Sequence, residues 1–118
     1  MTSFNFDTVV EDRVQKIAKI LSHKAREYAA DEDRFHNFNT AARIDNTYPE
    51  RALKGMWMKH LVSVFDLIDW AEAASHKITG ELIDEKIGDA INYLILLEGM
   101  LLQRKETEKI RMEKRRKG

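Results

Sequence analysis

The chain has 118 residues, with 20 Lys and Arg against 20 Asp and Glu, a single Pro, five Gly and no Cys. This length suits one domain, or one subunit of an assembly. The absence of cysteine excludes disulfides, thiolate metal sites and cysteine nucleophiles. Few Gly and Pro residues argue against a β architecture with many turns, so the composition predicts an all-α protein.

Neither a membrane span nor a signal peptide is expected. The longest uncharged stretch in the most apolar segment runs from Ala90 to Leu97, which is far too short to cross a bilayer. Residues 1–7 do not combine a basic region with an apolar one, as a signal peptide would. We therefore expect a cytoplasmic protein with no membrane partner.

The charge is unevenly distributed along the chain. Residues 103–118 hold eight basic and three acidic side chains, a net charge of +5, so the rest of the chain carries −5. Only Ile110 and Met112 are apolar there, so this segment cannot form a core. We predict a single helical domain over residues 1–103 and a basic, solvated helical extension over 104–118. Because clustered Lys and Arg attract polyanions, any contact with nucleic acid would use this extension.

Apolar periodicity predicts a first long helix and a short second one. A capping box formed by Thr8 and Glu11 would start the first helix near Asp7, and the helix would end near Ala30. Its apolar stripe consists of Val10, Val14, Ile17, Leu21, Ala25 and Tyr28. A connecting segment over 31–39 should follow, then a short helix over 40–44 and a turn at Asp45 and Asn46.

Two further long helices are predicted in the second half. Thr47 and Glu50 form another capping-box pattern, with Pro49 in the first turn of a helix that should end near Ala74. The last helix should begin near Thr79 or Gly80 and is apolar over far more than a third of its circumference. We therefore expect a bundle of about three long helices and one short helix, assembled as a dimer or a higher even-numbered homo-oligomer.

Two polar stripes interrupt these apolar helices. Lys59, Ser63 and Asp66 are spaced i, i+4, i+7 on the third predicted helix, with His60 beside them. The same spacing recurs on the fourth predicted helix with Glu85, Asp89 and Asn92. Each stripe is either an exposed polar face or part of a binding site.

The second stripe pairs two carboxylates, Glu85 and Asp89, one turn apart. Such a pair repels unless it is solvated, hydrogen-bonded or bridged by a cation such as Mg²⁺. The apolar residues that surround Asn92 and Tyr93 favour partial burial of this stripe. Gly88, in the helix interior, would allow close approach of another helix or a ligand.

The connecting segment places Arg34, Phe35, His36 and Phe38 close together. Arg can form a forked pair with phosphate, and an aromatic ring can stack on a base. The alternative is that Phe35 and Phe38 only fix the segment to the core.

At this point the residues suggest a family. The run from Glu85 to Leu94 resembles the second acidic motif of the MazG-like all-α NTP pyrophosphatases, in which a run of this kind binds Mg²⁺. Over residues 20–103 the chain also looks like small phage-encoded proteins of the nucleotide-modification-associated domain type. The residues that carry this second resemblance are Tyr28, Asp33, Arg34, Asn37, Phe38, the run Lys59–Ser63, Asp66, the run Asp84–Lys86, Asp89 and the run Asn92–Leu94.

The chain departs from the MazG-like pattern in its carboxylates. That pattern implies three clustered Glu on the preceding helix, whereas this chain has Lys59, His60, Ser63, Asp66 and Asp69 there. Lys86 also stands where the second motif would have its second Glu. Fewer carboxylates weaken Mg²⁺ binding, while Lys and His donate directly to phosphate oxygens. The residues therefore favour nucleotide binding without hydrolysis and without a cofactor.

We carry three hypotheses forward. The first is a phage-type protein, in the host cytoplasm, that binds and could sequester a nucleotide or nucleotide-derived signal. Its candidate ligand-binding residues are Tyr28, Arg34, Phe35, His36, Lys59, His60, Ser63, Asp66, Asp89 and Asn92. The second is a Mg²⁺-dependent nucleoside triphosphate pyrophosphohydrolase in which Glu85 and Asp89 hold the metal. The third is an oligomeric helical adaptor without a small ligand.

Overall fold

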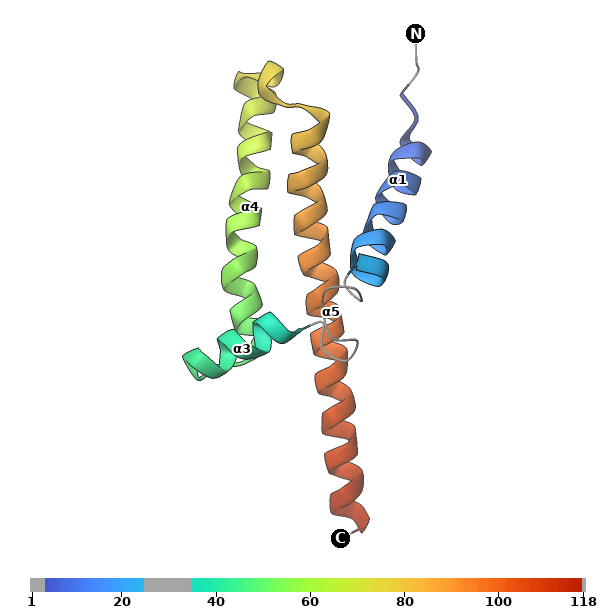
Figure 1. The fold of residues 1–118 in the computed structure, drawn as a ribbon, viewed down its shortest axis with the longest axis vertical. Coiled ribbons are helices and arrows are strands. Elements are labelled where there is room, and N and C mark those ends of the chain that lie inside the picture. Colours follow the sequence, from blue (N-terminus) through green and yellow to red (C-terminus); the bar gives the residue numbers. More distant parts are fainter. Residues whose placement is uncertain (1–3, 25–34, 118) are drawn as a thin grey trace.

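In a computed structural model of the protein, residues 4–24 and 35–117 are described. This part of the chain contains four α-helices and no β-strand, which confirms the predicted all-α class. Helices α4 and α5 form an antiparallel hairpin, α3 crosses the lower end of α4, and α1 lies on the opposite side of α5 (Figure 1).

The α4–α5 hairpin begins and turns where local chemistry predicts. Helix α4 (Pro49–Ala73) has Pro49 as its first residue, where the missing N–H has no intrahelical partner to lose. A 3₁₀ turn (Ser75–Lys77) leads to α5 (Gly80–Lys117). The Thr79 hydroxyl caps α5 by accepting a hydrogen bond from the Leu82 N–H at 3.1 Å.

Both predicted capping boxes are wrong. Helix α1 (Phe6–Ala18) is capped by Asn5, whose side chain accepts a hydrogen bond from the Asp7 N–H at 2.9 Å. The N-cap of α4 is Tyr48 rather than Thr47, its side chain makes no cap hydrogen bond, and Glu50 pairs with Arg104 far along the chain. A π-helical segment (Lys19–Lys24) follows α1, and the last part of the predicted helix, residues 25–30, lies outside the described residues.

Helix α3 (His36–Asp45) begins four residues earlier than predicted. It ends at Asn46, whose φ of 53° is left-handed and confirms the predicted turn. The next residue, Thr47, donates its N–H to the Ala42 carbonyl at 2.9 Å. This tight C-terminus brings the chain directly from α3 into α4.

The core is small and lies where α3, α4 and α5 meet. Phe38, Leu53 and Met100 form its buried cluster. Five partly buried side chains pack against the cluster: Phe35, Trp57, Tyr93, Leu96 and Leu97. The Trp57 indole N–H also donates to the Ala90 carbonyl at 3.2 Å, which joins α4 to α5.

Helix α1 is attached to α5 by charged groups. Lys16 and Arg13 donate hydrogen bonds to the Asp84 carboxylate at 3.0 and 2.9 Å. These bonds lower the pKa of Asp84 below its usual value, and the bond from Lys16 has the larger effect. The Arg13 guanidinium lies over Gly88, where a Cβ would meet it at 2.6 Å. The prediction that Gly88 allows a close approach is therefore confirmed, and the group that approaches it is the Arg13 side chain of α1.

Much apolar surface stays uncovered. On α1, Val10 and Val14 are 47% and 58% exposed, whereas Ile17 and Leu21 are partly buried, so only the start of the predicted stripe is uncovered; Ala25 and Tyr28 lie outside the described residues. The radius of gyration is 18.4 Å, against about 13–14 Å for a compact chain of this length. In the described part of the chain, no helix has the length and apolar character needed to cross a membrane.

Candidate functional site

His60 of α4 meets α5 at the centre of the predicted site. Its Nδ1 lies 3.6 Å from the Asp89 carboxylate, and its ring centroid lies 4.7 Å from that of Tyr93, with the planes tilted by 34°. Tyr93 in turn meets the buried Phe38 edge-on at 6.1 Å. A line of three rings therefore connects the core to His60, and the two polar stripes meet at the His60–Asp89 contact.

The electrostatics of this contact depend on the protonation of His60. A separation of 3.6 Å is too long for a hydrogen bond but allows an ion pair when the imidazole is protonated. Burial, and then the Asp89 charge, raise the pKa of the Tyr93 hydroxyl above its usual value. The Tyr93 phenol therefore stays neutral at physiological pH and keeps its proton available for donation.

Asn92 contributes an unsatisfied acceptor one helical turn from Asp89. Its Oδ1 is shielded from solvent and accepts no hydrogen bond from any described residue. Leaving a buried carbonyl oxygen unpaired costs about 1–3 kcal/mol. Native proteins pair nearly all such atoms, so this exception makes Asn92 a candidate member of the site.

The remaining α4 candidates do not reach α5. Lys59 and Asp66 are exposed, and the Ser63 hydroxyl donates to the Lys59 carbonyl of its own helix at 3.3 Å. None of these three side chains makes a hydrogen bond or ion pair with α5 in the described structure. The structure thus brings His60 together with Asp89, and leaves Lys59, Ser63 and Asp66 as an open polar face.

The candidate residues in and before the predicted connecting segment, residues 31–39, do not lie in one place. Phe35 packs against the core and covers Gly99, where a Cβ would lie 3.0 Å from the ring. This placement agrees with the alternative in which the aromatic side chain fixes the segment to the core. His36 is the exposed first residue of α3. Tyr28 and Arg34 lie outside the described residues.

The candidate metal ligands are two carboxylates on α5. The Glu85 side chain is 62% exposed, and its Oε1 lies 3.9 Å from Lys86 Nζ. The Asp89 carboxylate already contacts the His60 imidazole. Across residues 4–24 and 35–117, no group of three or more His, Asp or Glu side chains is arranged to hold a metal ion. Mg²⁺ often takes only one or two carboxylates and completes its shell with phosphates and water, so the pair still suits the pyrophosphohydrolase alternative.

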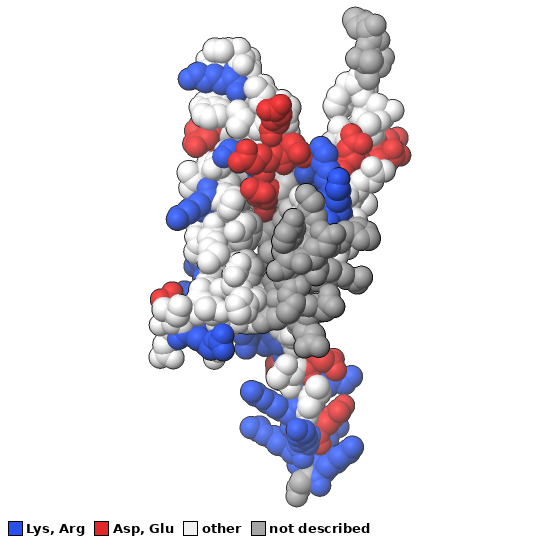
Figure 2. Space-filling model, in the orientation of Figure 1, with Lys and Arg blue, Asp and Glu red and all other residues white. Residues whose placement is uncertain are grey.

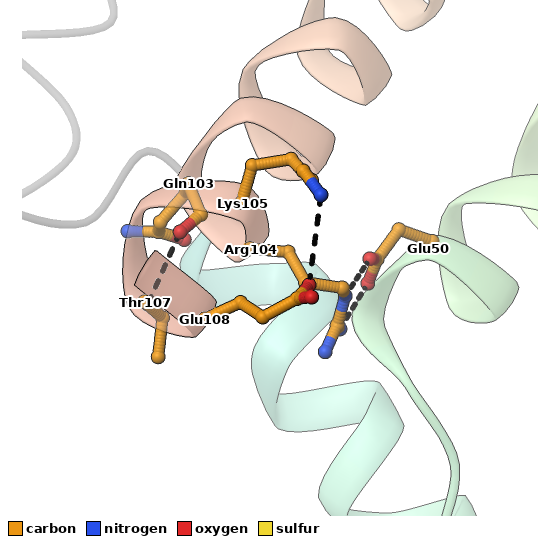
Figure 3. A network of polar contacts seen from close by, with 6 residues as sticks. All are labelled: Glu50, Gln103, Arg104, Lys105, Thr107 and Glu108. Atoms are coloured by element: carbon orange, nitrogen blue, oxygen red, sulfur yellow. Dashed lines mark hydrogen bonds and ion pairs between the residues drawn. The ribbon is translucent and has the colours of Figure 1, made fainter. Parts of the chain in front are cut away.

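A second polar network, which the sequence analysis missed, joins α5 to the start of α4. Figure 3 shows the Arg104 guanidinium facing the Glu50 carboxylate, with Nη2 2.7 Å from Oε1 and Nε bonded to Oε2. The Arg104 guanidinium also lies 4.6 Å from the Tyr48 ring centroid. Arg104 follows the buried Met100 by four residues, and this spacing is the signal that it still faces the body of the protein.

A cavity of about 300 Å³ lies beside this network. It is lined by Asn39, Pro49, Glu50, Met100, Gln103, Arg104, Thr107, Glu108 and Arg111. Its polar lining is already partly paired, since Lys105 approaches Glu108 at 3.8 Å and Thr107 donates to the Gln103 carbonyl at 3.1 Å (Figure 3).

The Glu50–Arg104 pair makes stability depend on acid pH. The hydrogen bond from Arg104 holds the pKa of Glu50 below its usual value near 4.5. The ion pair therefore stabilises the fold fully above the unfolded pKa of Glu50, near 4.5. This stabilisation is lost as the pH falls through the lower pKa of the folded state. We expect Glu50→Gln to flatten the decline of the urea midpoint between about pH 6 and about pH 3.

Glu113→Gln is the matched control for this prediction, because Glu113 is exposed and has no partner in the described structure. It should reproduce the wild-type dependence of the urea midpoint on pH. An equal dependence in Glu50→Gln would show that the ion pair does not form in solution.

The basic extension is the exposed end of α5. Residues 101–117 are all exposed, and the helix projects beyond the body of the protein (Figure 1). Lys and Arg side chains gather along this projection, whereas acidic side chains gather over the part of α5 beside α1 (Figure 2). The expected helical form of residues 104–117 is confirmed.

Comparisons with protein-family models, with curated proteins and with solved structures found no match to this chain.

Proposed function

We propose that the protein binds a nucleotide or a nucleotide-derived signal at the α4–α5 junction and does not hydrolyse it. The observation that carries this proposal is the placement of His60 against both Asp89 and Tyr93. That arrangement combines an imidazole that can become cationic, an aromatic ring and a carboxylate on two adjacent helices. These are the groups that a nucleotide needs for its phosphate, base and sugar.

The phosphate would be bound from α4. A protonated imidazole donates through its N–H groups, and Lys59, the preceding residue, offers an exposed ammonium group. Lys59 makes no ion pair in the described structure, so no intramolecular contact competes with phosphate. In contrast, Lys86 lies near Glu85, where its charge is partly neutralised.

The base and sugar would be bound from α5. The neutral Tyr93 hydroxyl can donate a hydrogen bond, and an Asn amide can read a base edge through one donor and one acceptor. Because Asn92 Oδ1 is shielded in the free protein, its side chain must turn toward the ligand, and a donor there would then remove the cost of leaving the oxygen unpaired. The Asp89 carboxylate can accept from a ribose hydroxyl or an exocyclic amine.

Binding is favoured over hydrolysis by the charges that surround the carboxylates. A metal-activated water needs a firmly held ion. Here Lys86 approaches Glu85 at 3.9 Å, and His60 approaches Asp89 at 3.6 Å, so both potential ligands face positive or potentially positive groups. Binding without turnover would suit sequestration of the ligand, as expected of a phage-type protein of this kind.

The second candidate is the Mg²⁺-dependent pyrophosphohydrolase. It is favoured by the partial exposure of Glu85 and Asp89, whose side chains are 62% and 44% accessible one turn apart. In that function, Asp89→Ala would abolish the release of pyrophosphate.

Thermal stabilisation by mono-, di-, tri- and cyclic nucleotides, with and without Mg²⁺, tests the proposal. We expect stabilisation that does not require Mg²⁺ and full recovery of the intact nucleotide by chromatography. Pyrophosphate released in Mg²⁺ and lost in Asp89→Ala would establish the hydrolase instead. The absence of stabilisation by every nucleotide would contradict both functions and favour the adaptor.

Calorimetric titration of variants locates the site. Removing one charge-assisted bond, in His60→Gln or Lys59→Ala, should weaken binding by roughly 1.5–3 kcal/mol, or about 10- to 150-fold. His76→Gln and Lys77→Ala are matched controls, because both residues are exposed in the 3₁₀ turn between α4 and α5. Equal affinities for His60→Gln and His76→Gln would exclude His60 from the site.

A further inference from the structure

Helix α4 carries an apolar stripe that no described helix covers. Met58, Phe65 and Ile68 are 48%, 55% and 62% exposed, and the half-buried Leu61 lies between them along the same stripe. In Figure 1, α4 forms one edge of the molecule, with α5 along one side, while α3 crosses only its lower end. The spacing of three, four and three residues from Met58 to Ile68 is that of a coiled-coil seam.

Charged residues continue this spacing at both ends of the stripe. Lys54 precedes Met58 by four residues, and Glu72 follows Ile68 by four residues. Both are exposed, and neither forms an ion pair in the described structure. We call the complete set the α4 seam: Lys54, Met58, Leu61, Phe65, Ile68 and Glu72.

The α4 seam is self-complementary about its midpoint at Ser63. Lys54 and Glu72 are each nine residues from Ser63, and the apolar residues are also placed in pairs at equal distances. Reversing the direction of the seam therefore places a basic end on an acidic end and apolar residues on apolar residues. This property is required of a surface that meets its own copy across a two-fold axis.

We propose that the α4 seam is a homodimer interface, in which it pairs antiparallel with the same seam of a second copy. Leu61 then packs against the partner's Phe65, and Lys54 lies opposite the partner's Glu72. A parallel pairing would place Lys54 against the partner's Lys54, and Glu72 against the partner's Glu72. Because like charges repel, the ends of the seam select the antiparallel orientation.

The pairing is compatible with the candidate site. From Lys54 to Glu72 the seam covers about 27 Å of helix, at 1.5 Å per residue. His60 meets α5 through Asp89 and Tyr93, so it is directed away from this interface. The dimer does not depend on nucleotide binding, and either proposal can fail without the other.

A charge swap tests the orientation, with the mass of the full chain measured by light scattering and sedimentation at micromolar concentration. The wild type should have twice the mass of one chain. Lys54→Glu or Glu72→Lys should each weaken the dimer about tenfold, since two end pairs change from attraction to repulsion. The double variant should restore it, and because the two residues are about 27 Å apart within one chain, the rescue must act between chains.

Phe65→Asp tests the apolar part of the seam. It should yield monomers with unchanged helix content by circular dichroism, because Phe65 is 55% exposed and lies outside the core. Phe4→Asp is the matched control, because Phe4 is an 81% exposed aromatic in the segment before α1, across α5 from α4 (Figure 1), and it should leave the dimer intact. A monomeric wild type, a dimer that persists in Phe65→Asp, or a double charge variant that fails to dimerise would overturn the proposal.

Discussion

Replacing Leu53 by alanine is expected to lower the free energy of unfolding by about 2–5 kcal/mol. Leu53 is 1% exposed and is the most deeply buried side chain of the small cluster that it forms with Phe38 and Met100. Truncation removes its apolar contacts and leaves a cavity that the surrounding side chains of α3, α4 and α5 can only partly close. Urea unfolding followed by circular dichroism would measure the loss.

The expected loss is large relative to the total, because domains are usually stable by only about 5–15 kcal/mol. Leu102→Ala is the matched control: Leu102 is on α5 but 63% exposed, so its truncation should change the free energy of unfolding by less than about 0.5 kcal/mol. Equal effects of the two substitutions would show that the cluster around Leu53 is not the centre of the core.

The helices that could be predicted from sequence are those specified by local chemistry. Pro49 begins α4, Thr79 caps α5 and the left-handed Asn46 ends α3, each through the behaviour of its own residue type. The two predicted capping boxes fail because each helix begins one or more residues away from the predicted cap, at Phe6 in α1 and at Pro49 in α4. Asn5 captures the Asp7 N–H, and Arg104 captures the Glu50 carboxylate.

The candidate site also has a part that local sequence predicts and a part that depends on how the helices pack. The i, i+4, i+7 spacing places the polar residues of each helix on one face, and the α4–α5 hairpin brings His60 to Asp89. The spacing alone does not show that Ser63 bonds back to its own helix or that Phe35 covers Gly99. Both contacts depend on the relative placement of elements, as does the Glu50–Arg104 pair across 54 positions.

A substitution at Asn92 should separate stability from binding. Its Oδ1 is shielded from solvent without a partner, which costs the free protein about 1–3 kcal/mol. Asn92→Ala removes the unpaired atom, and Ala also has the higher helix propensity. We therefore expect the free energy of unfolding to rise by about 1 kcal/mol in Asn92→Ala, measured by urea unfolding without ligand.

The same substitution should weaken nucleotide binding, because the ligand would lose the acceptor that the free protein leaves unpaired. Asn37→Ala on α3 is the control for the change of residue type, since Asn37 is exposed. A gain in stability with unchanged affinity would remove Asn92 from the site, and a loss of stability would mean that its Oδ1 has a partner in the chain. Higher stability together with lower affinity is expected where a polar atom destabilises the free protein but binds the ligand.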